Sequence, residues 1–196
     1  MRCMIWMLVL LCCMTSLPAK DVPLTPDSAH ASTGEAVNFL IHLNEVVVDK
    51  YFHNGDWEKA VAAIDRVIAL QPQGLEAYAN AAWLLWSTGK DARAMDYYQR
   101  MVDANPKNPE GYFIVGSMFF GRRRYADALP WLEKAEGLGI TSPHRHLLGH
   151  TLLKLGRHAD ALAFWQRVLA ADAKDDVARR QIDELKKKPS AVPAAK

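Results

Sequence analysis

The chain has 196 residues, half of them apolar, and its 24 Lys and Arg nearly balance its 22 Asp and Glu, which gives a formal net charge of +2. So small a net charge excludes the general attraction to nucleic acid that a strongly basic chain has, while the apolar half is enough to build a buried core. The three cysteines, Cys3, Cys12 and Cys13, stand close to the start, so the rest of the chain has no thiol for a disulfide or a thiolate metal site.

Residues 1–19 have the pattern of a secretory signal peptide. Arg2 precedes an unbroken apolar run over residues 3–14, and small residues follow up to Ala19. The run is well short of the ~20 residues that span a bilayer, so we expect cleavage after Ala19 and no stable transmembrane anchor. No Asn begins a glycosylation sequon, which favours export to a bacterial periplasm. Secretion, or membrane tethering through an uncleaved leader, is the alternative.

The segments on either side of the central part of the chain differ from it in composition. Residues 20–31 are rich in Pro, Asp, Ser and Thr and are expected to form a flexible tether, and residues 189–196 are expected to be a disordered tail. Between them, residues 32–188 are predicted to form one helical domain. Ser32 and Glu35 have the spacing of a capping box, so the first helix is expected to begin there and to end near Asn54.

Apolar residues in this domain recur at helical spacing, and the whole pattern repeats. The second helix of each copy begins its apolar pattern at an alanine, and successive alanines are 34, 34 and 33 residues apart: Ala60, Ala94, Ala128 and Ala161. The partner helices repeat in the same register, and Pro72 and Pro106 stand at unit ends. A helix–turn–helix repeat of this length resembles the tetratricopeptide repeat family.

The resemblance implies a fold class, an all-α right-handed superhelical solenoid of about four helix–turn–helix units with a C-terminal capping helix. The units are expected at about residues 41–74, 75–108, 109–141 and 142–175, with the cap at 176–187. The outer units depart further from the family pattern than the middle two. The fourth place of each unit, where Trp is common in the family, holds Asn44, Tyr78, Tyr112 and Arg145.

The resemblance also implies that a partner binds on the concave face, at the fifth, ninth and twelfth places of each unit. These places hold Glu45, Asp49, Phe52, Ala79, Trp83, Trp86, Phe113, Ser117, Phe120, His146, His150 and Leu153. Trp83 and Trp86, with Phe113 and Phe120 in the next unit, predict an apolar trough, because contiguous exposed aromatic side chains usually mark a binding surface. Packing between adjacent first helices, or coverage by the tether, is the alternative explanation of these four rings.

The best-known ligand of the family is a peptide C-terminal carboxylate held by Lys, Asn and Arg. Here Glu45 and Asp49 stand where cationic or neutral side chains would be needed, so this ligand class is not expected. His146 and His150 are four residues apart on one helix face and would bind a metal only if a third ligand converged on them. We expect stacked or solvated histidines and no metal.

Three consecutive arginines, Arg122, Arg123 and Arg124, occupy the turn of the third unit. They are interpreted as a solvated turn, with contact to a phosphate or an acidic partner as the alternative. Since no phosphate loop, nucleophile elbow or catalytic triad pattern occurs, the chain is predicted to be a non-catalytic protein–protein interaction scaffold that needs no cofactor and binds no nucleic acid. Self-association through the same face, without a separate peptide ligand, is the alternative function. An enzymatic or metal-dependent function would rest only on His146 and His150.

Overall fold

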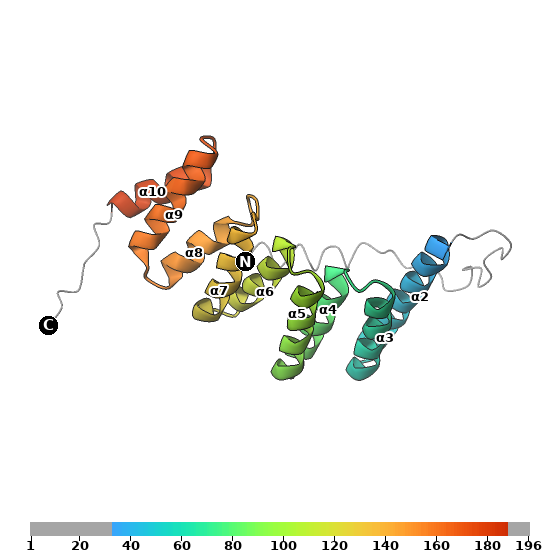
Figure 1. Ribbon diagram of the computed structural model, residues 1–196. Coiled ribbons are helices and arrows are strands. Elements are labelled where there is room, and N and C mark those ends of the chain that lie inside the picture. Colours follow the sequence, from blue (N-terminus) through green and yellow to red (C-terminus); the bar gives the residue numbers. More distant parts are fainter. Residues whose placement is uncertain (1–32, 188–196) are drawn as a thin grey trace. The chain divides into compact units, whose positions relative to one another are not determined.

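The computed structural model describes residues 33–187, which form nine helices and no strand (Figure 1). The helices are α2 Thr33–His53, α3 Trp57–Leu70, α4 Leu75–Ser87, α5 Asp91–Ala104, α6 Pro109–Gly121, α7 Tyr125–Gly137, α8 His146–Lys154, α9 His158–Ala171 and α10 Asp176–Lys187. The predicted leader, the tether with Ser32, and the C-terminal tail lie outside the described residues. The all-α fold class is confirmed for residues 33–187.

Successive helices are joined in pairs by tight turns. Figure 1 shows the antiparallel pairs α4 and α5, α6 and α7, and α8 and α9, and each helix also contacts the next one along the chain from α3 to α10. Three of the turns within pairs contain a glycine with a positive φ, at Gly55 (73°), Gly89 (75°) and Gly156 (73°). The fourth turn has Arg123 at the same place, with φ of 60°, in a backbone region that side chains other than glycine rarely adopt.

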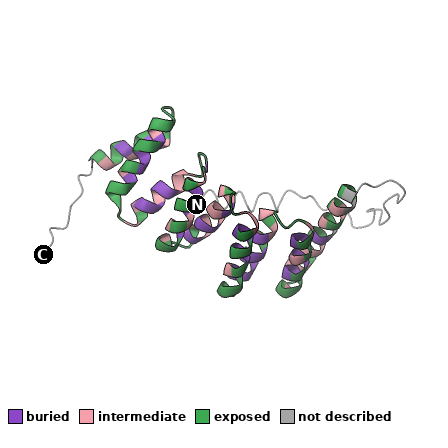
Figure 2. Cartoon of the chain, in the orientation of Figure 1, coloured by how far each residue is buried: buried purple, intermediate pink, exposed green. Residues whose placement is uncertain are grey.

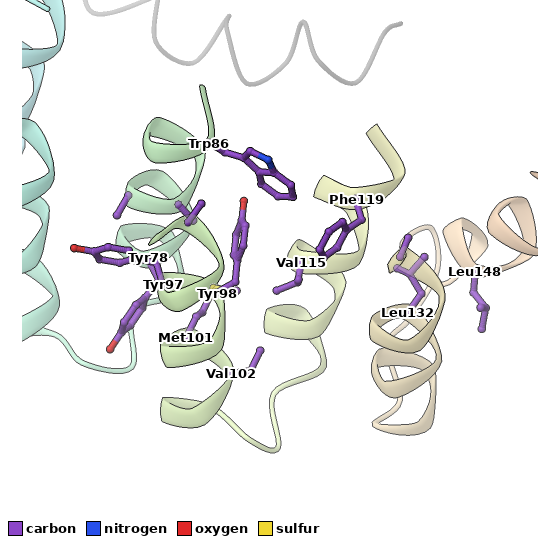
Figure 3. Packing of buried hydrophobic residues seen from close by; sticks show 14 of the residues in the cluster. Tyr78, Trp86, Tyr97, Tyr98, Met101, Val102, Val115, Phe119, Leu132 and Leu148 are labelled. Atoms are coloured by element: carbon purple, nitrogen blue, oxygen red, sulfur yellow. The ribbon is translucent and has the colours of Figure 1, made fainter. Parts of the chain in front are cut away.

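The core is a stripe along each second helix that packs against the first helices of its own unit and the next. In α5 the residues Ala94, Tyr97, Tyr98 and Met101 are all at most 5% exposed, and their spacing of three, one and three residues is that of one helical face. Figure 2 shows buried residues on the facing sides of the paired helices, and Figure 3 shows the side chains of α4 and α5 that meet Val115 and Phe119 of α6. The helical spacing of apolar residues in the sequence therefore corresponds to the buried face of the helix.

The residues at the fourth place of the first helices have polar partners. The Tyr78 hydroxyl donates to the Pro72 carbonyl oxygen at 3.0 Å, and the Tyr112 hydroxyl donates to that of Pro106 at 3.3 Å. In the first unit the buried Asn44 accepts a hydrogen bond from Arg66 Nε at 2.7 Å. The two tyrosines thus tie α4 and α6 to the ends of the preceding units.

Charged and phenolic side chains also link α3 to α5. Glu58 accepts hydrogen bonds from Arg93 Nη1 at 2.8 and 3.0 Å and forms an ion pair with Lys90. The hydrogen bonds from Arg93 and Lys90 lower the pKa of Glu58 to about 2. The Tyr97 hydroxyl donates to Asp65 Oδ1 at 2.7 Å, and burial together with this hydrogen bond raises the pKa of Tyr97 to about 12. Adjacent units therefore have polar as well as apolar contacts.

The first and second helices of the last two units approach closely at a glycine. A Cβ on Gly116 would lie 2.6 Å from Leu132, and one on Gly149 would lie 2.9 Å from Phe164 Cδ1 and closer still to Trp165. Both neighbours belong to the buried core, with Trp165 fully buried and Leu132 2% exposed. Neither neighbour can move aside without opening the core, so these two positions require glycine.

Gly149→Ala is expected to destabilise the protein by about 1–3 kcal/mol, because the added methyl group overpacks the contact with Trp165. The loss should appear as a fall of several degrees in the melting temperature measured by circular dichroism. Gly111→Ala is the matched control, since its Cβ would lie 3.6 Å from Leu75 Cδ2 and 3.7 Å from Val102 Cγ1, which is ordinary contact. This variant should be neutral or gain up to about 1 kcal/mol from helix propensity. Equal effects at the two positions would contradict the close-packing argument.

Candidate functional site

The predicted binding residues occupy the first helices α2, α4, α6 and α8, and their exposure differs widely. Glu45, Asp49 and Trp83 are exposed, and most of the others are partly buried: Phe52, Ala79, Phe113, Ser117, Phe120, His146, His150 and Leu153. Ser117 donates its hydroxyl hydrogen to the Ile114 carbonyl oxygen of its own helix at 2.8 Å, so this side chain is already satisfied. Trp86 is buried.

An aromatic cluster stands on this surface where α2, α3 and α4 meet. The ring centroids of Phe52 and Trp57 are 5.3 Å apart in an edge-to-face arrangement, and those of Phe52 and Trp83 are 6.1 Å apart and stacked. Trp57 and Trp83 remain 37% and 39% exposed. We call Phe52, Trp57 and Trp83 the Trp83 cluster. Trp57 was not predicted, because its position as the first residue of a second helix carries no periodic signal.

The expected exposure of Trp86 is wrong. Its side chain is 7% exposed, and its ring lies edge-on to Tyr98 and Phe119 with centroid distances of 5.8 and 5.3 Å. The Arg122 guanidinium lies 3.9 Å from the centroid of the same ring. Trp86 is at the end of α4, where the beginning of the turn brings α5 and α6 close, so the ring fills the space between helices (Figure 3).

Phe113 and Phe120 are covered in part by neighbouring rings. Phe113 stacks on His144 with ring centroids 4.2 Å apart, and Phe120 meets Tyr125 edge-on at 5.2 Å. The four predicted aromatic residues therefore do not present one continuous exposed trough within the described part of the chain. Neighbouring rings cover Trp86, Phe113 and Phe120 wholly or in part, and Trp83 is the one of the four that is exposed, at 39%.

Carboxylates flank the Trp83 cluster on α2. Asp49 Oδ1 lies 3.3 Å from His53 Nδ1, and Glu45 Oε2 lies 3.8 Å from His42 Nδ1. All four side chains of these two pairs are well exposed, so water and salt screen the interactions between them. This stretch of α2 thus exposes two carboxylates, Asp49 and Glu45, together with Lys50 and with His53, whose ring lies edge-on to Phe52 at 5.7 Å.

His146 and His150 have separate surroundings. His146 Nε2 lies 2.6 Å from Asp175 Oδ2, and the Ser142 hydroxyl lies 3.3 Å from the same nitrogen. A catalytic relay needs the hydroxyl and the carboxylate on different ring nitrogens, so this geometry does not form one. His150 meets Trp165 edge-on at 5.3 Å, and burial, followed by the nearby His146 and Lys154, lowers its pKa.

In addition to its contact with His146, Asp175 contacts the last helix, α10. Its Oδ1 accepts a hydrogen bond from the Ala178 backbone N–H at 2.9 Å, so the side chain caps α10. Burial is the largest influence on its pKa and acts to raise it. The hydrogen bonds from Ala178 and His146 outweigh burial, and the pKa of Asp175 lies below its ordinary value of 3.8.

No metal-binding group is found in residues 33–187, where no three His, Cys, Asp or Glu side chains converge. None of the helices described between these residues combines the length and apolar character that crossing a bilayer requires. An open hollow of about 380 Å³ lies between α7, α8 and α9 and is lined by residues that include Glu136, Leu152, Arg157, Phe164 and Arg167. The predicted binding residues do not line it.

Two family models match the chain. The model described as tetratricopeptide repeat matches residues 48–109, and that described as anaphase-promoting complex, cyclosome, subunit 3 matches residues 87–168. These matches support the tetratricopeptide repeat family. Tetratricopeptide repeat proteins generally mediate protein–protein interactions, and their fold is typically a non-catalytic scaffold.

Curated relatives agree with this family. The TPR repeat-containing protein MJ1345 of Methanocaldococcus jannaschii is 26% identical over 88 residues, which are 43% of this chain and 28% of that protein. Photosystem I assembly protein Ycf3 of Synechococcus sp. is 27% identical over 88 residues, 43% of this chain and 51% of that protein. The chain thus spans about half or less of the length of these relatives.

Solved structures with the same fold include MamA and pilF of Pseudomonas aeruginosa. MamA has a TM-score of 0.54 at 19% identity and covers 76% of this chain and 82% of its own. The pilF structure has a TM-score of 0.52 at 19% identity and covers 78% of this chain and 68% of its own. At these identities the likeness shows the fold alone, and it confirms the predicted tetratricopeptide repeat solenoid.

Asp175→Asn and Asp175→Ala should separate the charge of Asp175 from its capping role. The asparagine oxygen can still cap α10, so Asp175→Ala is expected to lose about 0.5–2 kcal/mol more than Asp175→Asn at pH 7. Because folding favours the ionised form of Asp175, its charge stabilises the protein above its ordinary pKa of 3.8, and this stabilisation is lost as the pH falls through the lower folded-state pKa.

Urea unfolding at a series of pH values measures both effects. The difference in unfolding free energy between the wild type and Asp175→Asn should be present at neutral pH and should shrink as the pH falls below 3.8. A difference that stayed constant down to the lowest pH at which both proteins fold would show that the carboxylate charge makes no contribution.

Proposed function

We propose that this chain is a non-catalytic scaffold that binds a segment of another protein at the Trp83 cluster. The observation that supports the proposal is the exposure of Trp57 and Trp83, each more than one third open although Phe52 joins their rings into one surface. A tryptophan supplies a large contact area and loses little conformational entropy on binding, so exposed, pre-positioned tryptophans are effective anchors. The family supports the general role, and the exposure of the two tryptophans supports the choice of the Trp83 cluster.

The proposed partner segment carries an apolar or aromatic side chain next to Lys or Arg. The apolar side chain would cover Trp83 and Phe52, and the cation would face Asp49 and Glu45 on the same side of α2. Since carboxylates beside the cluster repel acidic residues, the site discriminates by charge as well as by apolar contact. A free peptide C-terminus does not suit it for the same reason.

Selection of a random-peptide display library on the purified protein tests both the role of Trp83 and the proposed chemistry of the partner segment. Selected peptides should share an aromatic or large aliphatic residue flanked by Lys or Arg. Trp83→Ser should weaken their binding by at least about 2 kcal/mol, the effect typical of a central interface tryptophan, in isothermal titration calorimetry. Val46→Ser is the control, because Val46 is also an exposed apolar residue of a first helix, at 54% exposed, but lies outside the cluster.

Two outcomes would contradict the proposal. Selected peptides that bind Trp83→Ser as well as the wild type would place the partner elsewhere. A wild type whose sedimentation shows concentration-dependent assembly, and a Trp83→Ser variant that stays monomeric without any peptide, would instead favour the self-associating structural module.

We propose further that the protein works in the cell envelope after export. The support is the leader pattern of residues 1–19 in the sequence. Expression of the full chain in a bacterial host should give a periplasmic product that begins at Lys20, as determined by mass spectrometry of the intact protein. Replacing Val9 and Leu10 with Asp should keep the product in the cytoplasm, because two charges within its apolar run make the leader a poor export signal. An unprocessed or cytoplasmic wild-type product would contradict export.

A further inference from the structure

The turn between α6 and α7 differs from the other turns within helix pairs. It consists of Arg122, Arg123 and Arg124, which we call the arginine turn. Arg123 adopts φ of 60° at the place where Gly55, Gly89 and Gly156 stand in the other units. Glycine adopts this conformation without steric conflict, whereas an arginine does not. The fold itself would be served better by glycine, so the side chain of Arg123 calls for another explanation.

The three arginines have different contacts. Arg124 Nε donates to Asp127 Oδ2 at 2.7 Å, and its guanidinium lies 4.8 Å from the Phe119 ring centroid, so this side chain is engaged within α7 and α6. The Arg122 guanidinium lies against Trp86 at 3.9 Å. The exposed guanidinium of Arg123 has no hydrogen bond, ion pair or ring contact with any side chain of residues 33–187. Arg122 and Arg123 thus have no carboxylate partner among residues 33–187.

A second polar group with unused hydrogen-bonding capacity lies beneath this turn. The Tyr98 side chain is fully buried, and its hydroxyl has no hydrogen-bond partner in the part of the chain that the structure describes. Figure 3 shows the hydroxyl directed at the Trp86 ring, the same ring that the Arg122 guanidinium contacts. Buried hydroxyl groups are normally satisfied, so the unpaired Tyr98 hydroxyl is an unusual feature of the packing beneath the arginine turn.

We propose that the arginine turn binds a segment of a partner protein that is rich in Asp and Glu. A guanidinium presents paired N–H donors that match the two oxygens of a carboxylate, and stacking on Trp86 holds the Arg122 guanidinium in place for such a contact. Arg123 supplies the second cation one residue away. The site is separate from the Trp83 cluster in its residues and opposite in charge preference, so it extends the proposed function rather than depending on it.

Other anionic partners fit the turn less well. Nucleic acid and anionic membranes are bound by broad basic surfaces, and here two unpaired guanidinium groups stand next to the carboxylate of Asp127 in a chain of net charge +2. A phosphate group is usually held by several converging donors, whereas Arg124 is already paired with Asp127. Two separate carboxylates on a flexible segment match two separate guanidinium groups.

Fluorescence anisotropy with a labelled peptide of alternating Glu and Ser tests the proposal. The peptide should bind the full-length protein, more weakly as salt is added, and the same peptide with Gln in place of Glu should not bind. Arg123→Gln should raise Kd about two- to fivefold, the range for one exposed ion pair, and Arg122→Gln with Arg123→Gln should raise it further. Lys107→Gln is the matched control, because it removes one exposed cation from the loop at the other end of α6 and should leave Kd unchanged.

Arg123→Gly separates loss of binding from loss of folding. It removes the guanidinium and also relieves the strained backbone, so it should weaken peptide binding as Arg123→Gln does while the melting temperature stays equal or rises. Backbone amide chemical shifts should change on peptide addition at residues 122–127. Unchanged affinity in both Arg123 variants, or equal binding of the Gln peptide, would overturn the proposal. Arg123-dependent binding to phosphatidylglycerol vesicles without binding to the Glu peptide would overturn it in favour of a membrane contact.

Discussion

The structure depends on the close approach of the two helices in each unit, and that approach depends on residues with small side chains. Ala60, Ala94, Ala128 and Ala161 begin the buried faces of the second helices and have no exposed surface. Interaxial distance is set by the side chains at the contact, so alanine and glycine there let the larger neighbours on either side interlock. Because each first helix buries one face in this packing, its opposite face is left exposed.

Contacts between units add to the packing within them, and they join nearest neighbours. Tyr78 and Tyr112 bond to the ends of the preceding units, Glu58 bridges to the start of α5, and Asp175 joins α8 to α10. Stability in such an array is approximately the sum of the unit stabilities and the interfaces between neighbours. A side chain can therefore stay exposed in one unit with little effect on stability beyond the adjacent units, as Trp57 and Trp83 do in the described part of the chain.

The sequence was sufficient for the fold because the signals that define it are local and repeated. The 34-residue period and the alanine spacing predicted the helices, their buried faces and the family. The sequence could not separate Trp83 from Trp86, because the two lie on one helix only three residues apart. What distinguishes them is cover from other elements, since Tyr98, Phe119 and Arg122 all lie against Trp86. The pairing of His146 with Asp175 likewise joins residues 29 positions apart and has no sequence motif. Long-range contacts were the part that sequence reasoning lacked.

The two proposed binding surfaces have opposite charge preferences, and this has a consequence for selectivity. Asp49 and Glu45 stand beside the Trp83 cluster, while Arg122 and Arg123 stand beside α6. An exposed ion pair contributes about 0.2–1 kcal/mol, so each charged surface alone discriminates weakly. A partner that carries a basic apolar segment and an acidic segment would engage both, and the second contact would then form at the effective concentration set by the linker between them. Selectivity would arise from the order and spacing of the two segments along the partner, a property that neither surface can recognise alone.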